Sequence, residues 1–347
     1  AAGYLEPEME ILGWLKKPVV VLLNQTSPEG DIEAEEAEWR RHLAACPHVK
    51  RVLTLDAFAR CWIQENHLLS TLEEVVTDEK KEAFACLRRA WEKRNLDAFD
   101  DAMRLLADLL AAAVLDGVKV RPESLLEKMG IGRAEIKQEY AEARQELATR
   151  LAHRVERVTN TLILLHGLEG EAGARAALTL TGHFHTPENI SESIWGALGG
   201  IAGGAMGGLI ADLKMGGMTF GGGALLGGLG GGVATYAVIR SYNLVRGGDQ
   251  MMHWSKEHFR EQVRLAVLCY LAVAHYGRGR VAWQESEQPR KWRMAVDKMT
   301  EQEMHAVDEL WKLGVESESM PDLIVRKAHL LVKRLTQLVL GQLYPGL

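Results

Sequence analysis

Two uncharged, glycine-rich runs constrain this chain more than any other part of its sequence. The first extends from Ser193 to Ala211 and the second from Met215 to Ile239, with only Asp212-Leu213-Lys214 between them. Half of the 34 glycines of the chain lie in this region. Because about 20 apolar residues are enough to cross a bilayer core, either run is long enough to do so.

Glycines in both runs recur every four residues. In water, each glycine inside a helix is about 1 kcal/mol less favourable than alanine, so a soluble helix of this composition would barely form. In lipid, an unpaired backbone group costs several kcal/mol, which keeps the chain helical, and rows of glycine let a second helix approach closely. The spacing therefore predicts a glycine-zipper hairpin over residues 191–247, with helix-packing or membrane-facing roles for Gly196, Gly200, Gly204, Gly208, Gly223, Gly227 and Gly231.

Three interpretations of residues 191–247 remain open: a flexible loop, a hairpin buried within an oligomer, and a hairpin that spans or conditionally enters a membrane. The isoleucine, leucine, methionine and phenylalanine content is untypical of a linker and favours the membrane hairpin. Arg240 and Arg246 fit a hairpin whose two ends face the cytoplasm. We therefore expect a cytoplasmic protein associated with the inner membrane, with lipid and further copies of itself as partners.

The first 76 residues alternate between helical and strand patterns. Residues 19–23 (VVVLL) form an apolar, β-branched run, which is typical of a strand buried on both faces of a parallel sheet. Residues 49–55 form a second expected strand, and helical patterns surround both. This alternation predicts part of a parallel sheet with helical crossovers, with helices over residues 7–17, 31–45 and 56–76.

The remainder of the chain reads as amphipathic helix. The predicted fold class is therefore mainly α: a partial α/β fragment over residues 1–76, followed by an all-helical domain with the glycine-rich hairpin inside it. The first half of that domain covers residues 77–190 and the second half residues 248–347. Helices are expected over residues 79–94, 96–115, 133–165, 251–276, 297–313 and 320–343.

Composition excludes several classes of protein. The formal net charge of −6 argues against binding nucleic acid through bulk positive charge. The four cysteines form no CxxC pair, so neither a disulfide framework nor a structural zinc site is expected. His183 and His185, and likewise His253 and His258, are interpreted as surface histidines, and no metal site is predicted. The chain contains no GxxxxGK[ST] phosphate loop.

Asn24 is the candidate binding residue of the first region. It follows the buried strand at residues 19–23 and is followed by Gln25 and Thr26. In open α/β sheets, ligands bind outside the carboxyl ends of the strands. An asparagine amide at that position can both donate to and accept from a base edge. A loop asparagine after a strand is common, so Asn24 alone is a weak signal.

The stretch from Pro18 through VVVLLN, Gln25-Thr26 and the acidic helix to VKRVLTLDAF is similar to the last third of an Era-like, translation-factor-class GTPase. In that class, the strand ends in Asn-Lys-x-Asp, which reads guanine. Asn24 matches the asparagine, whereas Gln25 and Ser27 stand where the class has lysine and aspartate. The resemblance implies base-binding roles for Asn24, Thr26 and Asp56, the last in the next base-binding loop.

The whole layout resembles a bacterial family in which an Era-like GTPase domain is fused to a C-terminal domain of unknown function. PVVVLLNQT and the segment KMGGMTFGGG at residues 214–223 carry this resemblance. It implies that a phosphate loop and magnesium-binding strands lie before Ala1, in an upstream half of the G domain. GTP and Mg²⁺ are thus implied for the complete protein, with no cofactor and no catalytic residue in this part. We expect GTP hydrolysis only with the upstream half present.

The expected function is that of a C-terminal effector portion of a GTPase-type protein. Its glycine-zipper hairpin would insert into membrane or mediate oligomer assembly as the nucleotide state shifts the conformational ensemble. The alternatives are a nucleotide-independent membrane or pore-forming structural oligomer, and a soluble helical scaffold. Nucleotide binding by the chain with its upstream sequence restored would separate the first reading from the other two.

Overall fold

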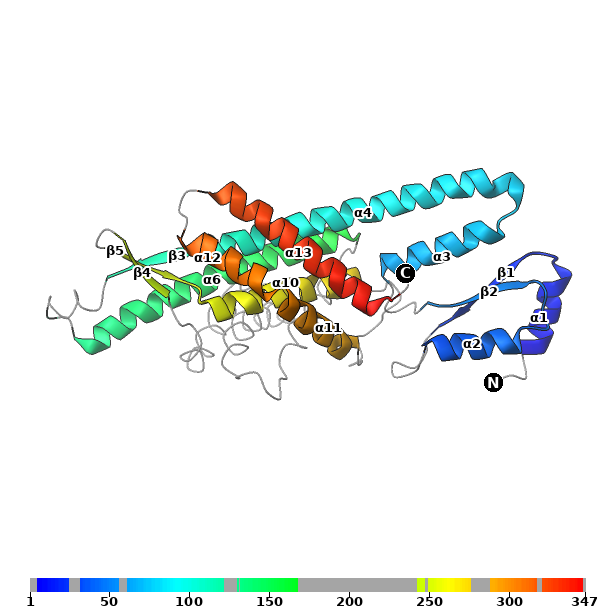
Figure 1. The fold of residues 1–347 in the computed structure, drawn as a ribbon, viewed down its shortest axis with the longest axis horizontal. Helices are drawn as coiled ribbons and strands as arrows, with labels where there is room; N and C mark the ends of the chain where they lie inside the picture. Colours follow the sequence, from blue (N-terminus) through cyan, green and yellow to red (C-terminus); the bar gives the residue numbers. More distant parts are fainter. Residues whose placement is uncertain are drawn as a thin grey trace, which may run out of the picture. The chain divides into compact units, whose positions relative to one another are not determined.

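Helices dominate the fold, which confirms the mainly α prediction. The computed structural model divides into two compact units: residues 1–100, 274–292 and 341–347 in the first, and residues 101–273 and 293–340 in the second. Figure 1 shows the elements of both. The structure describes residues 5–24, 32–55, 61–121, 130, 132–167, 242–246, 249–275, 288–316 and 320–345. Thr26, Asp56 and all seven glycines of the predicted zipper lie outside these ranges.

A two-stranded parallel sheet forms the centre of the first unit. β1 (Val19–Leu23) pairs with β2 (Val49–Thr54), with Val21 opposite Val52. α2 (Ile32–His42) makes the crossover between the two strands. Both strands and their parallel pairing confirm the prediction from the VVVLL run and the helix–strand alternation.

Helices cover both faces of this sheet (Figure 1). α1 (Leu5–Trp14) and the end of α2 contribute to a core on one face, in which Met9, Leu23, Leu43 and Val52 are buried. α3 (Trp62–Val75) lies on the other face, where Arg51 Nη2 of β2 is 2.8 Å from Glu74 Oε2. Helices on both faces are what a parallel sheet requires.

α4 (Asp78–Leu115) is one continuous helix. This corrects the prediction of two helices at residues 79–94 and 96–115. Asn95 does not interrupt α4, because asparagine inside a helix costs less than about 1 kcal/mol and no glycine or proline lies between residues 78 and 115. The first half of α4 runs antiparallel to α3. Trp62 contacts Phe99 with ring centroids 6.1 Å apart, and Arg88 pairs with Glu73 further along.

The second unit contains a three-stranded antiparallel sheet, so the prediction of an all-helical domain was wrong. β3 (Gly117–Val120), β5 (Asp249–His253) and β4 (Tyr242–Arg246) lie in the order β3-β5-β4. β5 also overturns the predicted helix start at Met251, because its backbone pairs with strands on both sides. β4 lies within the last residues of the 191–247 segment, beyond the apolar run that ends at Ile239.

α6 (Arg133–Leu165) is confirmed over the predicted range. It packs on the three-stranded sheet and on the second half of α4. Their shared core buries Leu109, Leu147, Leu151, Met252 and Trp254.

Four helices complete the described chain. α10 (Lys256–Ala274) is the most buried of them, and α13 (Pro321–Leu343) confirms the predicted last helix. The helix predicted at residues 297–313 is instead two: α11 (Gln288–Gln302) and α12 (Met304–Glu316). Arg260 Nε and Nη2 of α10 hold the two oxygens of Asp308 on α12 at 2.7 and 2.6 Å. None of the helices in the described ranges combines the length and apolar character needed to cross a membrane.

Candidate functional site

The carboxyl ends of β1 and β2 form the edge at which the sequence predicts a binding site. The backbone N–H of Leu55 donates to the carbonyl of Leu23 at 3.0 Å, so the two strands end together. Asn24 follows Leu23 directly and is exposed. The fold therefore places Asn24 at the sheet edge where ligands of open α/β folds bind, as predicted. Its partners in the prediction, Thr26 and Asp56, fall outside the described residues.

Glu36 of α2 reaches the same edge, although no sequence motif singles it out. Its Oε1 accepts a hydrogen bond from the backbone N–H of Thr54 at 2.8 Å, and its Oε2 accepts one from Arg40 Nη2 at 2.7 Å. The side chain is 17% exposed. Glu36 thereby fixes α2 to the end of β2. Only its place in an acidic helix could have drawn attention to it, and three other glutamates share that helix.

Cys61 directly precedes α3 and is its N-cap residue. Its backbone N–H donates to Gln64 Oε1 at 3.1 Å, which caps the first turn of α3. Its thiol is fully buried, and this burial raises the thiol pKa to about 12. Cys61 is therefore a packing residue and not a nucleophile at neutral pH.

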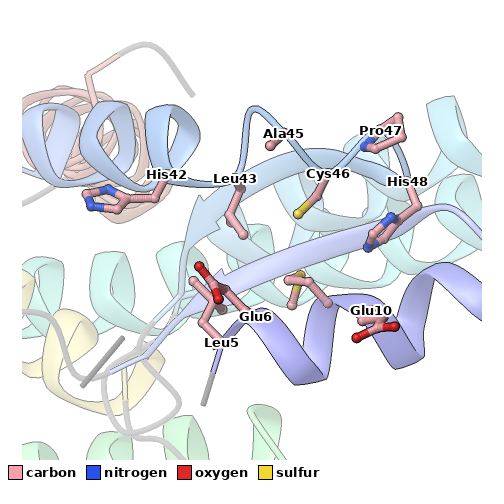
Figure 2. A pocket seen from close by; sticks show the side chains of 10 residues that line it. Leu5, Glu6, Glu10, His42, Leu43, Ala45, Cys46, Pro47 and His48 are labelled. Carbon is pink, nitrogen blue, oxygen red and sulfur yellow. The ribbon is translucent and has the colours of Figure 1, made fainter. Parts of the chain in front are cut away.

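A shallow hollow of about 280 Å³ lies at the opposite end of the sheet. α1 and the segment that leads into β2 form it, and Figure 2 shows Glu6, Glu10, His42, Cys46 and His48 around it. Because β2 begins at Val49, this hollow lies at the amino end of the strand. It is thus separate from the edge that carries Asn24. Within the described ranges, no group of three or more histidine, cysteine or acidic side chains could hold a metal ion.

Buried polar groups in the second unit correct the interpretation of His253 and His258 as surface residues. Both are buried, at 8% and 1% exposure. His253 Nδ1 is 3.0 Å from the carbonyl oxygen of Asp116. His258 stacks on the indole of Trp254. The sequence pattern did not reveal the short strand β5, which ends with His253 and leads into the first turn of α10, where His258 lies. His183 and His185 lie outside the described residues.

The carboxyl ends of β1 and β2 thus carry the exposed Asn24, and the Glu36 carboxylate anchors α2 to the end of β2. An amide can form paired hydrogen bonds with the edge of a planar ligand. The described residues at this edge contain no phosphate-binding loop.

Comparison with known proteins gives one match. The family model described as Domain of unknown function (DUF3482) matches residues 40–320. No curated protein and no solved structure matches the chain. The matched range begins within α2, so β1 and Asn24 precede it, and it includes the glycine-rich segment and most of both units. The chain therefore belongs to the family described as Domain of unknown function (DUF3482).

Proposed function

We propose that this chain is the effector portion of a GTPase-type protein. In this proposal, the first unit contributes the last strands of an Era-like nucleotide-binding domain, and Asn24 contacts the base. The glycine-rich segment then inserts into membrane, or assembles with other copies, under the control of the bound nucleotide. The observation that carries the proposal is the parallel β1–β2 pair, which exposes Asn24 at its carboxyl edge.

Uncovered apolar surface beside β1 supports the proposal. Within the described residues, β1 pairs on one side alone, with β2. Leu22 of β1 is 44% exposed, Ile11 and Trp14 of α1 are 53% and 70% exposed, and Leu15, directly after α1, is 60% exposed. Parallel sheets are normally covered on both faces and rarely stop at two strands. A further parallel strand with its covering helix would pair with β1 and bury these side chains.

The framework around the glycine-rich segment supports control of that segment by the rest of the chain. α6 ends shortly before residues 168–241, and β4 begins immediately after them. Both elements belong to the second unit, where β4 is joined through β5 to β3, and β3 packs on α6. A change in this framework would therefore act on both ends of the segment together.

Membrane flotation tests the proposed insertion of the glycine-rich segment into membrane. The full chain and a variant with residues 193–239 replaced by a short polar linker are mixed with phospholipid vesicles and centrifuged through a density gradient. The proposal expects only the intact chain to float. Gly204→Leu with Gly208→Leu closes one glycine row while keeping the segment apolar, and should change oligomer size. If neither chain floats and the double variant keeps its size, the chain is a soluble scaffold.

Nucleotide binding tests the proposed role of Asn24. The chain is extended by the sequence that precedes it in its gene, and its affinity for a fluorescent guanine nucleotide is measured with Asn24 and with Asn24→Ala. We expect binding that weakens by about 5- to 150-fold in the variant, since a paired base contact contributes about 1–3 kcal/mol. Glu38→Ala, an exposed change on α2, is the control. Membrane binding without any nucleotide binding would favour the nucleotide-independent oligomer.

A further inference from the structure

The start of α10 buries an unusual group of polar side chains. Ser255 caps the helix: its Oγ accepts from the backbone N–H of His258 at 3.2 Å, and its carbonyl accepts from Phe259 at 2.9 Å. This cap fixes His258 in the first turn. Gln262 lies one turn later on the same face of the helix. His258 is 1% exposed and Gln262 is 6% exposed.

Five polar atoms of this group have no hydrogen-bond partner in the described part of the chain. They are Nδ1 and Nε2 of His258, Nε2 and Oε1 of Gln262, and Nε1 of Trp254. The rings of His258 and Trp254 stack with centroids 4.3 Å apart and 16° between their planes. The three side chains therefore form one cluster, and not separate unsatisfied residues.

The cluster faces α6. Cys269 lies two turns beyond Gln262 on the same face of α10, and its Sγ is 3.5 Å from Thr159 Oγ1 of α6. At the other end, Trp254 belongs to the core that contains Leu147 and Leu151 of α6. Trp254 thus joins the cluster to the middle of α6, where the α6 side chains of that core are apolar.

Such a cluster is unfavourable unless something satisfies it. A buried donor or acceptor without a partner destabilises the folded state, and native proteins leave few of them. Empty internal space in proteins is normally apolar, whereas polar internal sites hold water or ligand. Five unpaired atoms in one place therefore indicate an occupant.

We propose that Trp254, His258 and Gln262 line an internal binding site for a small, uncharged polar ligand that both donates and accepts hydrogen bonds. The indole N–H is a donor, a neutral imidazole offers one donor and one acceptor, and the amide offers donors and an acceptor. Burial lowers the pKa of His258 to about 4, so the ring is neutral at pH 7. None of the three side chains then carries charge, which favours an uncharged ligand because a buried ion would lack a paired charge.

Water and a small hydroxylated solute share this chemistry. Either would bridge α10 to the α6 side of the core and stabilise that contact, because a ligand that binds only the folded state shifts folding towards it. α6 precedes the glycine-rich segment and α10 follows it. The site is thus independent of the base-binding edge and goes beyond the proposed nucleotide function.

Two measurements on the full chain test the proposal. In the first, ¹⁵N-histidine NMR detects magnetisation transfer from water to the His258 imidazole, assigned by its disappearance in His258→Phe. In parallel, mass spectrometry identifies small molecules released when the purified chain is denatured. Transfer from water shows a hydrated site, and a released hydroxylated solute shows a solute site. If a correctly folded chain gives neither of these signals, the proposal is overturned.

The second measurement uses apolar replacements of similar shape. His258→Phe, Gln262→Met and the double variant are compared by thermal unfolding. If a shared ligand is bound, each single change lowers the midpoint by several degrees, and the double change lowers it little further because the ligand is already lost. The matched control is Thr300→Val on α11, a buried hydroxyl also without a partner, which should keep or raise the midpoint. If both single changes raise the midpoint and their effects add, the site is empty.

Discussion

The carboxylate of Asp116 lies 2.6 Å from Nη1 of Arg154, and its other oxygen lies 2.9 Å from Nη1 of Arg150. The Asp116 side chain is 6% exposed. Asp116 sits between the end of α4 and the start of β3, and both arginines belong to α6. One buried carboxylate therefore joins α4, β3 and α6 at the point where α6 meets the sheet.

Asp116→Ala should lower the free energy of unfolding by about 3 kcal/mol, because it leaves two guanidinium groups beside a site with no anion. Urea unfolding followed by circular dichroism measures this change. Asp101→Ala is the matched control on α4, since it removes an exposed pair with Arg104. An exposed pair contributes about 0–1 kcal/mol. Equal losses for the two variants would contradict a structural role for the Asp116 cluster.

Two glycines in the last helices should respond to alanine in opposite directions. At Gly314 of α12, an added Cβ would lie 2.6 Å from both Cγ atoms of Val114, which is buried on α4. Gly314→Ala should therefore destabilise the fold by about 1–3 kcal/mol through overpacking. At Gly341 of α13, no atom of the described residues lies within 4 Å of an added Cβ, and Gly341→Ala should stabilise the fold by about 0.5–1 kcal/mol through helix propensity.

Thermal unfolding of the two alanine variants distinguishes these signs directly. Adding Val114→Ala to Gly314→Ala makes room for the new methyl group, so the double variant should lose less stability than the two single changes summed. If the two losses of stability simply add, the close approach of Gly314 to Val114 is not the reason why residue 314 must be small.

The elements that the sequence predicted correctly are those with a strong local signal. The VVVLL strand is apolar throughout and bounded by Pro18 and Asn24, and the α6 pattern repeats apolar residues over 33 positions. β3 and β5 were missed because GVKV and DQMMH, at four and five residues, are too short for a pattern to stand out. Their pairing joins residues more than 100 positions apart, such as Gly117 and His253, and no local pattern reports it.

The candidate site was predictable to the same extent. Asn24 follows a recognisable buried strand, so its place at the carboxyl edge could be inferred from the sequence. The contact of Glu36 with Thr54 could not, because it depends on how the α2 crossover packs against β2. The buried cluster around His258 was equally hidden, since a histidine in an amphipathic helix gives no sign of which face it occupies.

The contact between Glu36 and Thr54 leads to a third prediction. Glu36→Ala should lower the free energy of unfolding by about 1 kcal/mol, because the backbone N–H of Thr54 loses a half-buried acceptor. Chemical unfolding measures the loss. Glu38→Ala, on the exposed side of α2, should change stability by less than about 0.5 kcal/mol. If both variants behave alike, the carboxylate of Glu36 does not anchor α2 to β2.

The four cysteines should separate by reactivity. Cys86 is exposed on α4, and Cys46 is half-buried. Burial raises the thiol pKa of Cys61 to about 12 and that of Cys269 to about 11, so neither forms thiolate at pH 8. A chromogenic disulfide reagent should therefore modify Cys86 first, Cys46 more slowly, and the other two only after denaturation. Cys86→Ser should remove the fast phase; a fast phase that persists would place another thiol at the surface.

His258 should make the stability of the second unit depend on pH. Burial lowers its pKa from 6.5 to about 4 in the folded chain, so between these values the unfolded state binds the proton and the folded state does not. Stability is then fully present above pH 6.5 and falls as the pH drops towards 4, by about 2 kcal/mol at pH 5. Unfolding free energies of the intact chain and of His258→Phe, measured at several pH values from 7.5 to 4.5, give this contribution as their difference. Other titrating groups cancel in that difference. A difference that stays constant across the range would show that His258 gains its proton as easily in the folded chain as in the unfolded one.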